Sequence, residues 1–416
     1  MGLGIFMAII ISENLIAQWN GLKLYLFDTK KHYKGYCVEA EKAKMLSYVD
    51  GNKDIYELWK EVSKEYDFSQ CPNAEDDIKT FYRSLMSQGI LEESEQGDVN
   101  NVFGEYEKYY PLVITLELTN QCNFMCTHCY KDSNPDNLRR LPYEEVKWII
   151  DNFSGKSYCL GLSGGEPCLH PYVNEILLYA NEKNMSTRLI TNLSSLSKIK
   201  DEALKSIGLL QFTLYGYNSE LYYRYTRNSN FNTVKENMRR IGEQKINSMA
   251  QILLRDDVID DLELYIALLK KYGIKRVKFG LVSKVGRGEQ SYESEWKVHS
   301  EKQQIFYKKL IRIKNIYPDF IFEDFAFDNE EDGSHAGGVC FHCDAGENSI
   351  IVSENGVIRP CQYMPERIFG LSNIRQYHEV VMNGKVFDFS YCVEQYIAEQ
   401  KEKGIEINEV CPKGLG

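Results

Sequence analysis

Residues 113–132 read VITLELTNQCNFMCTHCYKD, an apolar run that leads directly into three closely spaced cysteines. The run 113–118 has the composition of a buried strand, so the cysteines follow a strand end in the pattern CxxxCxxC. Cys122, Cys126 and Cys129 are therefore expected on one loop. In barrels of parallel strands this end gathers the active-site residues, so the stretch indicates both a fold class and a site.

The chain from Pro111 onward alternates strand-like and helix-like segments, which predicts parallel strands joined by right-handed crossovers. Further strands are expected at 158–162, 187–191, 210–215, 249–254 and 275–282. Helices are expected from Pro142 and at about 171–184, 195–206, 231–244, 257–272 and 298–316. The segment 111–325 is too short for eight strand–helix units, so we predict an α/β fold with a partial (β/α)6 TIM-like barrel.

Three thiolates suit three irons of a 4Fe–4S cluster, whose usual protein complement is four cysteines. The missing ligand would leave one iron open to a small chelating molecule. The alternative is a zinc site with His128 as the fourth ligand, because zinc prefers a closed tetrahedral set. A second motif, LSGGEP, follows the next strand and contributes Gly164, Gly165 and Glu166. Glycines allow close approach to the backbone, and a carboxylate can accept bonds from an ammonium group.

CxxxCxxC, His128 before its last cysteine, and SGGEP resemble the hallmarks of the radical S-adenosylmethionine (SAM) superfamily, over roughly residues 111–416. The resemblance implies that the three cysteines hold a 4Fe–4S cluster whose open iron binds S-adenosyl-L-methionine, with the GGE residues at its methionine part. It also suggests further cofactor-binding residues on later strands, for which ordinary strand-end polar residues are the alternative. These candidates are Thr191, Asn192, Tyr215 and Arg227, beside His128.

The C-terminal segment 326–416 contains SIIVSENGVIRP, which predicts a β-hairpin around Asn355-Gly356. The spacing from Cys343 through Gly356 to Cys361 resembles the auxiliary-cluster domains called SPASM and twitch. The chain lacks the dense later cysteines of full SPASM domains, so the resemblance implies one auxiliary 4Fe–4S cluster. A zinc knuckle is the alternative. The candidate ligands are Cys340, Cys343, Cys361, Cys392 and Cys411.

Residues 1–95 form a separate pattern of short strands followed by three amphipathic helices, near 39–49, 54–66 and 74–88. Its apolar start, 5–12, is expected to be a buried strand or an appended extension. A polar run at 92–101 has the composition of a linker, and we place the boundary between the two domains at a linker over 96–110. The pattern resembles the RiPP recognition element, a winged-helix-like α+β domain that binds leader peptides by strand addition. A winged-helix DNA reader with a sensing cluster is the rival, although the third helix is acidic for a DNA groove.

Taken together, the resemblances imply a radical SAM enzyme that modifies a ribosomally synthesised precursor peptide by 5′-deoxyadenosyl-radical hydrogen abstraction. A thioether crosslink of the sactipeptide or ranthipeptide type is the favoured product. Carbon–carbon or carbon–oxygen crosslinking, epimerisation and a non-peptide substrate are the alternatives. A flavodoxin or ferredoxin type of electron donor is expected. The net charge of −11 argues against a nucleic-acid partner, and no segment indicates a membrane, so a cytoplasmic location is expected.

Overall fold

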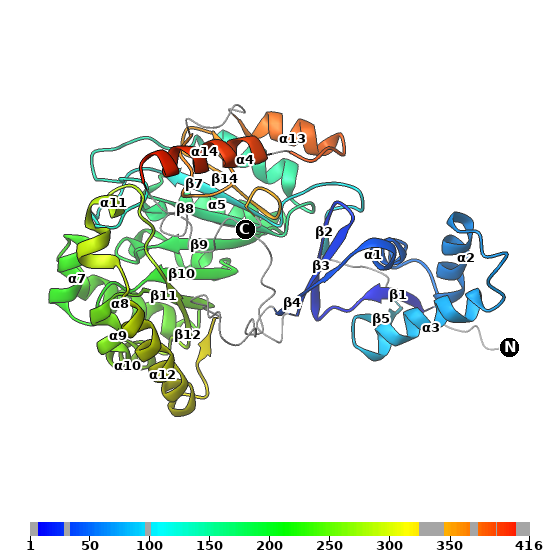
Figure 1. Cartoon of the computed structure of the whole chain (residues 1–416), viewed down its shortest axis with the longest axis horizontal. Coiled ribbons are helices and arrows are strands. Elements are labelled where there is room, and N and C mark those ends of the chain that lie inside the picture. The colour runs from blue at the N-terminus through cyan, green and yellow to red at the C-terminus, as the bar shows by residue number, and fades with distance from the viewer. Residues whose placement is uncertain are drawn as a thin grey trace.

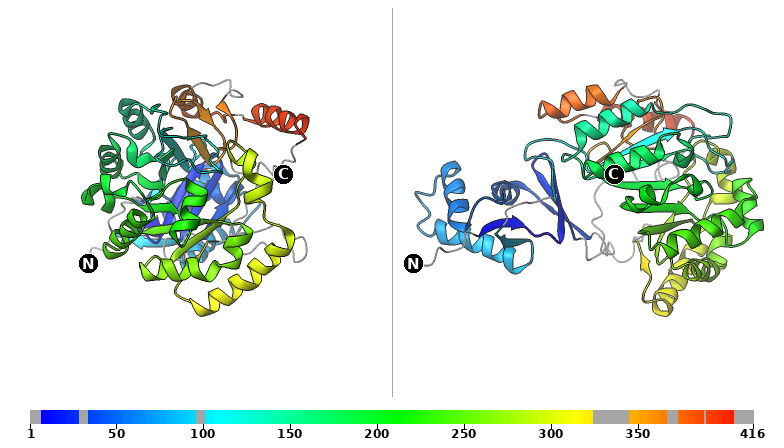
Figure 2. Two further views of the ribbon diagram at one scale, coloured as in Figure 1. Left: turned by 90° about the vertical axis from the view of Figure 1, so that its left-hand side faces the viewer. Right: turned by 180° about the vertical axis from the view of Figure 1, so that it is seen from behind.

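The computed structural model describes residues 7–28, 34–95, 101–323, 345–366, 373–387 and 389–404. An N-terminal unit of strands and helices, blue in Figure 1, lies beside a larger body built around one long sheet. The right-hand view of Figure 2 shows the same two parts from behind, again side by side. No helix in the described part of the chain is long and apolar enough to cross a membrane.

Parallel strands form the centre of the larger body, and each pairs with the next in chain order. They are β7 (Val113–Thr119), β8 (Cys159–Gly164), β9 (Ser186–Thr191), β10 (Leu209–Thr213), β11 (Ser248–Leu253) and β12 (Arg276–Gly280). A short strand, β13 (Ile321–Phe322), pairs in parallel with the far edge of β12. This order confirms the predicted α/β fold, a partial barrel, and every strand lies within a few residues of its expected place.

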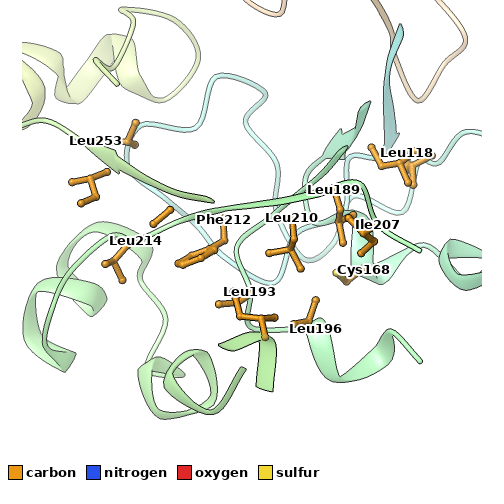
Figure 3. Close-up of a cluster of buried hydrophobic side chains, with 14 of the residues drawn as sticks. Leu118, Cys168, Leu189, Leu193, Leu196, Ile207, Leu210, Phe212, Leu214 and Leu253 are labelled. Carbon is orange, nitrogen blue, oxygen red and sulfur yellow. The ribbon is translucent and has the colours of Figure 1, made fainter. Parts of the chain in front are cut away.

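Helices connect these strands and cover the sheet (Figure 1). They are α4 (Tyr143–Phe153), α5 (Val173–Glu182), α6 (Asp201–Lys205), α8 (Phe231–Glu243), α10 (Leu262–Lys271) and α12 (Ser300–Ile316). In α4 the apolar residues Val146, Ile149, Ile150 and Phe153 recur at helical spacing and are fully buried. Figure 3 shows part of the resulting core, where Leu189, Leu210 and Phe212 of the strands meet Leu193 and Leu196 of the connecting segments.

Two helical segments close to the three-cysteine loop were not predicted. The helix α7 (Ser219–Thr226) follows β10, and its N-cap Asn218 accepts a bond from the backbone N–H of Leu221. After β12, the short helix α11 (Gly288–Ser291) continues into a π-helical turn, η3 (Tyr292–Trp296). Such turns widen the helix locally and occur often at functional sites. Their mixed polar and aromatic sequences have no simple period, which explains why the pattern did not reveal them.

The predicted C-terminal hairpin is present, with β14 (Ser349–Val352) antiparallel to β15 (Ile358–Arg359) and Gly356 at φ +78° in the turn. Its place was not expected, because β14 pairs in parallel with β7, with Ser349 opposite Val113. The hairpin thus extends the barrel sheet past its first strand. Two helices, α13 (Ile374–Met382) and α14 (Ser390–Glu402), follow it.

The N-terminal unit has its own core between a sheet and three helices. The sheet order is β4 (Lys34–Val38), β3 (Lys23–Asp28), β2 (Leu15–Asn20) and β6 (Val102–Phe103). The helices are α1 (Ala40–Leu46), α2 (Ile55–Glu65) and α3 (Ala74–Ser87). The apolar N-terminal run is a buried strand, β1 (Ala8–Ile11), antiparallel to β5 (Leu91–Ser94). The expected polar linker at 92–101 therefore begins as a strand, because Leu91 is buried and the backbone pairs with β1.

Amide side chains fasten this unit to the barrel. Gln18 on β2 donates to the backbone oxygen of Lys156 at 2.7 Å and accepts from the backbone N–H of Tyr158 at 2.9 Å. Asn20 donates to the side-chain oxygen of Asn348, just before β14, at 2.9 Å. Gln18 and Asn20 are both buried, so these bonds satisfy polar groups that would otherwise be costly.

A buried ion network joins the first barrel strand to the three-cysteine loop and the hairpin. Glu117 of β7 accepts from Lys131 at 2.6 Å and from Arg359 of β15. Lys131 also contacts Glu354 in the hairpin turn at 2.7 Å, and the Tyr130 hydroxyl donates to Glu117 at 2.8 Å. All four charged side chains are at most 7% exposed. The network contains two carboxylates and two buried cations, and the exposed Arg139 also lies 3.7 Å from Glu354.

Removal of one partner from this network leaves an uncompensated buried charge, so Arg359→Met is expected to lower the free energy of unfolding by about 3–5 kcal/mol. Urea-induced unfolding measures the change. Lys183→Met is the control, because it removes an ion pair with Asp151 in which both side chains are about 40% exposed. The control should cost less than about 1 kcal/mol. Equal effects of both substitutions would contradict a special role for the buried network.

The same network predicts a pH dependence. Burial alone raises the pKa of Glu117, but the charges of Lys131 and Arg359 outweigh it and lower the pKa below its ordinary value. The carboxylate therefore stabilises the fold fully above its unfolded pKa, and this contribution is lost as the pH falls through the lowered folded pKa. The difference in unfolding free energy between the native protein and Glu117→Gln should be largest near neutral pH and shrink in acid. A difference that grows in acid would contradict the assignment.

Candidate active site

The three cysteines lie together on the loop that follows β7. Cys122 and Cys126 are buried and Cys129 is partly buried. The sulfur of Cys122 accepts from the backbone N–H of Phe124, and that of Cys129 from Ser133, each at 3.4 Å. Burial raises the pKa of Cys122 to about 12, so the metal-free thiol is neutral and metal binding would release its proton.

The end of α7 holds the outer side of this loop. The backbone N–H of Met125 donates to the oxygen of Thr226, and that of Thr127 donates to the oxygen of Tyr225, each at 3.1 Å. These bonds satisfy loop donors that lie outside regular secondary structure. The unpredicted helix α7 therefore positions the loop.

The two glycines of SGGEP are required by the packing of the chain against itself. Gly164 has φ +126°, a region that side chains rarely adopt, and a Cβ there would lie 2.4 Å from the backbone oxygen of Thr119. A Cβ on Gly165 would lie 2.4 Å from the backbone oxygen of Gln121. The backbone N–H of Gly165 donates to Thr119 at 2.6 Å. The glycines thus let the end of β8 approach the start of the three-cysteine loop.

Glu166 is fully buried and ties the ends of β8 and β9 together. Its carboxylate accepts from the Thr191 hydroxyl and the Asn192 backbone N–H, each at 2.7 Å, and from the Cys168 backbone N–H at 3.1 Å. Burial raises its pKa despite these donors. The side-chain amide of Asn192 in turn lies 3.8 Å from the sulfur of Cys122. Sequence-predicted residues from three segments thus meet in one polar cluster.

His128 and Tyr215 form an aromatic wall beside the cysteines. The two rings are 5.3 Å apart, and Trp296 of η3 lies 4.4 Å from His128 on the same cluster of rings. Burial, with the nearby charges of Arg255 and Arg287, lowers the pKa of His128 to about 3, so its imidazole is neutral. Its Nδ1 is buried without a hydrogen-bond partner among the described residues. A polar atom of this kind fits a site that takes up a further polar group.

The remaining predicted residues are placed differently. Arg227 is exposed at the C-terminal end of α7, with φ 56°. Cys361 follows β15 and is partly buried. Cys340, Cys343 and Cys411 lie outside the described residues, as does the side chain of Cys392.

Arg255 is a site residue that the sequence reasoning missed. It follows β11, is 2% exposed, and stacks its guanidinium over the ring of Tyr225 at 3.5 Å and that of Trp296 at 4.9 Å. Its Nε donates to Asp257 at 2.9 Å. Arg255 and Asp257 line a cavity of about 300 Å³, together with Tyr225. The run RDD directly after a predicted strand was the available signal.

Known proteins share parts of this arrangement. Residues 116–269 match the radical SAM superfamily. The chain is 25% identical over 346 residues to the antilisterial bacteriocin subtilosin biosynthesis protein AlbA of Bacillus subtilis (strain 168). This alignment covers 79% of the chain and 75% of AlbA. Streptococcus suis SuiB has the same fold, with a TM-score of 0.64 and 14% identity over 92% of this chain and 89% of SuiB. The structure of anSMEcpe with bound AdoMet and Cp18Cys peptide matches with a TM-score of 0.51 and 14% sequence identity. The match covers 73% of this chain and 88% of anSMEcpe.

A radical SAM domain implies S-adenosylmethionine and a 4Fe–4S cluster, and the residues present fit both. Three sulfurs, two buried and one partly buried, share one loop, and two of them accept hydrogen bonds from backbone N–H groups, as cluster thiolates do. A cluster of polar groups and an unpartnered His128 nitrogen lie beside them. The family match, the order of parallel strands and the three-cysteine loop agree that residues 116–269 belong to a radical SAM domain, in a chain that is similar to AlbA.

Proposed function

We propose that this radical SAM enzyme modifies a ribosomally synthesised precursor peptide and joins a cysteine sulfur to a carbon atom in a thioether link. The observation that carries the proposal is that one chain combines the three-cysteine loop with two further units, a hairpin that is followed by a cysteine and a domain with an outer strand among the described residues. Among the relatives, AlbA is named for bacteriocin biosynthesis, and one SuiB structure is described as bound to the precursor peptide SuiA. The thioether is favoured because this combination of domains resembles that of thioether-forming enzymes.

Different residues of the loop and its surroundings would bind the cluster and the cofactor. Cys122, Cys126 and Cys129 would each hold one iron. When bound, the cluster and S-adenosylmethionine supply a 5′-deoxyadenosyl radical that removes a hydrogen atom from the peptide. Glu166 already fixes the ends of two strands, and its remaining lone pair can accept from the cofactor's ammonium group. The rings of His128 and Tyr215 would exclude water from the reacting atoms.

The position of Cys361 favours the proposal of an auxiliary cluster close to the active site. It lies two residues after Arg359, which contacts Glu117 in the buried ion network. Tyr363 places its ring 6.3 Å from that of Tyr130, the residue after Cys129. A cluster bound by Cys361 would therefore lie near the three-cysteine loop. The other proposed ligands are Cys340, Cys343, Cys392 and Cys411.

The N-terminal unit has an edge suited to an extended peptide. Among the described strands β4 lies at one end of this sheet, next to β3, and Tyr36 on it is 54% exposed. A leader peptide can add to such an edge through backbone hydrogen bonds. A DNA reader is disfavoured, because the first turn of α3 carries Glu75, Asp76 and Asp77, which would repel phosphates.

Iron content and cofactor cleavage test the enzyme. Anaerobic reconstitution of the full chain should give about eight irons, for two 4Fe–4S clusters. Replacement of Cys122, Cys126 and Cys129 by Ala should halve the iron and abolish 5′-deoxyadenosine formation with dithionite. Cys159→Ala, which alters a buried cysteine of β8 outside the loop, should change neither. Cys361→Ala should keep cofactor cleavage and lose the peptide product. Stoichiometric zinc without iron would refute the assignment.

Peptide binding tests the N-terminal unit in the full chain, since removal of β2 would strip Gln18 and Asn20 from their partners. A leader peptide encoded beside this gene should bind, and proline in its paired segment should weaken binding about tenfold or more, because proline removes a ladder donor. Alanine at the same positions should have little effect. The modified core peptide should lose two hydrogens and one free thiol. Steep salt-dependent binding to duplex DNA, with indifference to leader, would favour the DNA reader instead.

A further inference from the structure

The segment after β12 folds back against the three-cysteine loop. A Cβ on Gly286 would lie 2.4 Å from the backbone oxygen of Cys129 and 2.5 Å from that of Tyr130, and its φ is +60°. The backbone N–H of Arg287 donates to the same Cys129 oxygen at 3.0 Å. Two chain segments more than a hundred residues apart thus meet backbone to backbone at the last cysteine of the motif.

The Arg287 side chain spans the loop from the second cysteine to beyond the third. Its Nε donates to the backbone oxygen of Cys126, and its Nη2 donates to the backbone oxygen of Ser133, each at 2.8 Å. Its Nη1 pairs with Asp132. The guanidinium is planar and presents its donors in a fixed fork, so one side chain sets the separation of two carbonyls that flank Cys129. A flexible lysine ammonium cannot reproduce this geometry.

The rest of the segment supports the same loop at one residue. Ser291 of α11 donates its hydroxyl to the backbone oxygen of Thr127 at 2.9 Å. The indole N–H of Trp296 donates to the Thr127 hydroxyl at 3.2 Å, while its ring packs on His128. The π-helical turn that carries Trp296 thus completes a brace over residues 126–133.

We propose that Arg287 is a positioning residue that holds the three-cysteine loop in its ligand-binding shape and places a fixed positive charge beside Cys126. The inference rests on the proposed function only for the identity of the bound cluster. The loop has little regular secondary structure, and carbonyls that lost the donors of Arg287 would reorient to find others. Asp132, which pairs with Nη1, is 71% exposed and therefore screened by water, whereas the Arg287 side chain is 19% exposed. The remaining positive charge favours the more reduced, more negative state of a bound cluster, because nearby charge is one of the factors that set its potential.

A matched control exists elsewhere in the barrel. Arg240 of α8 also donates to two backbone carbonyls, those of Leu196 at 3.0 Å and Ile199 at 2.8 Å, and pairs with Asp201. Its chemistry is the same as that of Arg287, but it braces a connection after β9 that carries no cysteine. Arg240→Gln therefore measures the effect of losing a guanidinium that joins two backbone carbonyls at a place without cysteines.

The first experiment uses the metal-free full chain, with urea midpoints to verify folding. Alkylation of Cys122, Cys126 and Cys129, followed by mass spectrometry, should be at least tenfold faster in Arg287→Gln than in the native protein. Arg287→Lys should be intermediate, because it keeps the charge and loses the fork. Arg240→Gln should alkylate at the native rate. Native alkylation rates in both Arg287 variants would overturn the inference, whatever the enzyme's activity.

The second experiment uses the reconstituted protein. Iron loss to a chelator should be at least tenfold faster in Arg287→Gln, and the potential of its three-cysteine cluster, followed by its EPR signal, should shift to more negative values. Arg287→Lys should restore most of the potential but not the resistance to chelation. An unchanged potential and unchanged iron loss in Arg287→Gln would overturn the inference. Failure of the native chain to bind any iron–sulfur cluster would instead refute the proposed function, and the alkylation result would still decide the role of Arg287.

Discussion

The burial of Glu117 is the constraint on which the arrangement of the barrel edge depends. An ionised carboxylate at 1% exposure persists only where cations replace water around it. Lys131 comes from the loop after the third cysteine, and Arg359 comes from the hairpin that follows the barrel. Loss of the loop would leave Glu117 and Glu354 with a single buried cation, and loss of the hairpin would remove the arginine that pairs with Glu117. The ion pairs of this network therefore hold the loop and the hairpin together against β7.

The three-cysteine loop is held from several directions by segments that are distant in the sequence. The end of α7 binds its outer backbone, the glycines of β8 approach its start, and the segment after β12 covers its end. Because the backbone of the loop forms no regular hydrogen-bond ladder of its own, each neighbour supplies donors or acceptors that a helix or sheet would otherwise provide. The shape of the site is therefore a property of the whole barrel rather than of the motif.

The sequence predicted the parts of this protein that have a period or a spacing. Strands such as Val113–Thr119 and the helix over Tyr143–Phe153 follow from apolar patterning, and the Asn355-Gly356 turn follows from its need for positive φ. The placement of Cys122, Cys126 and Cys129 on one loop follows from their close spacing after the strand. Arg255 and Arg287 were missed, because a buried guanidinium depends on partners from other strands, and no local pattern records them. The pairing of β14 with β7 was missed for the same reason.

That pairing has a consequence for how the chain folds during synthesis. The first barrel strand is made more than two hundred residues before the strand that covers its outer side. Until the ribosome has released the hairpin, β7 presents an open row of backbone donors and acceptors, with Glu117 lacking its arginine. Contacts of such long range close slowly, and the exposed edge is a site for mispairing with other nascent chains. Yield in the cell should therefore depend on chaperone supply and translation speed as much as on the stability of the finished fold.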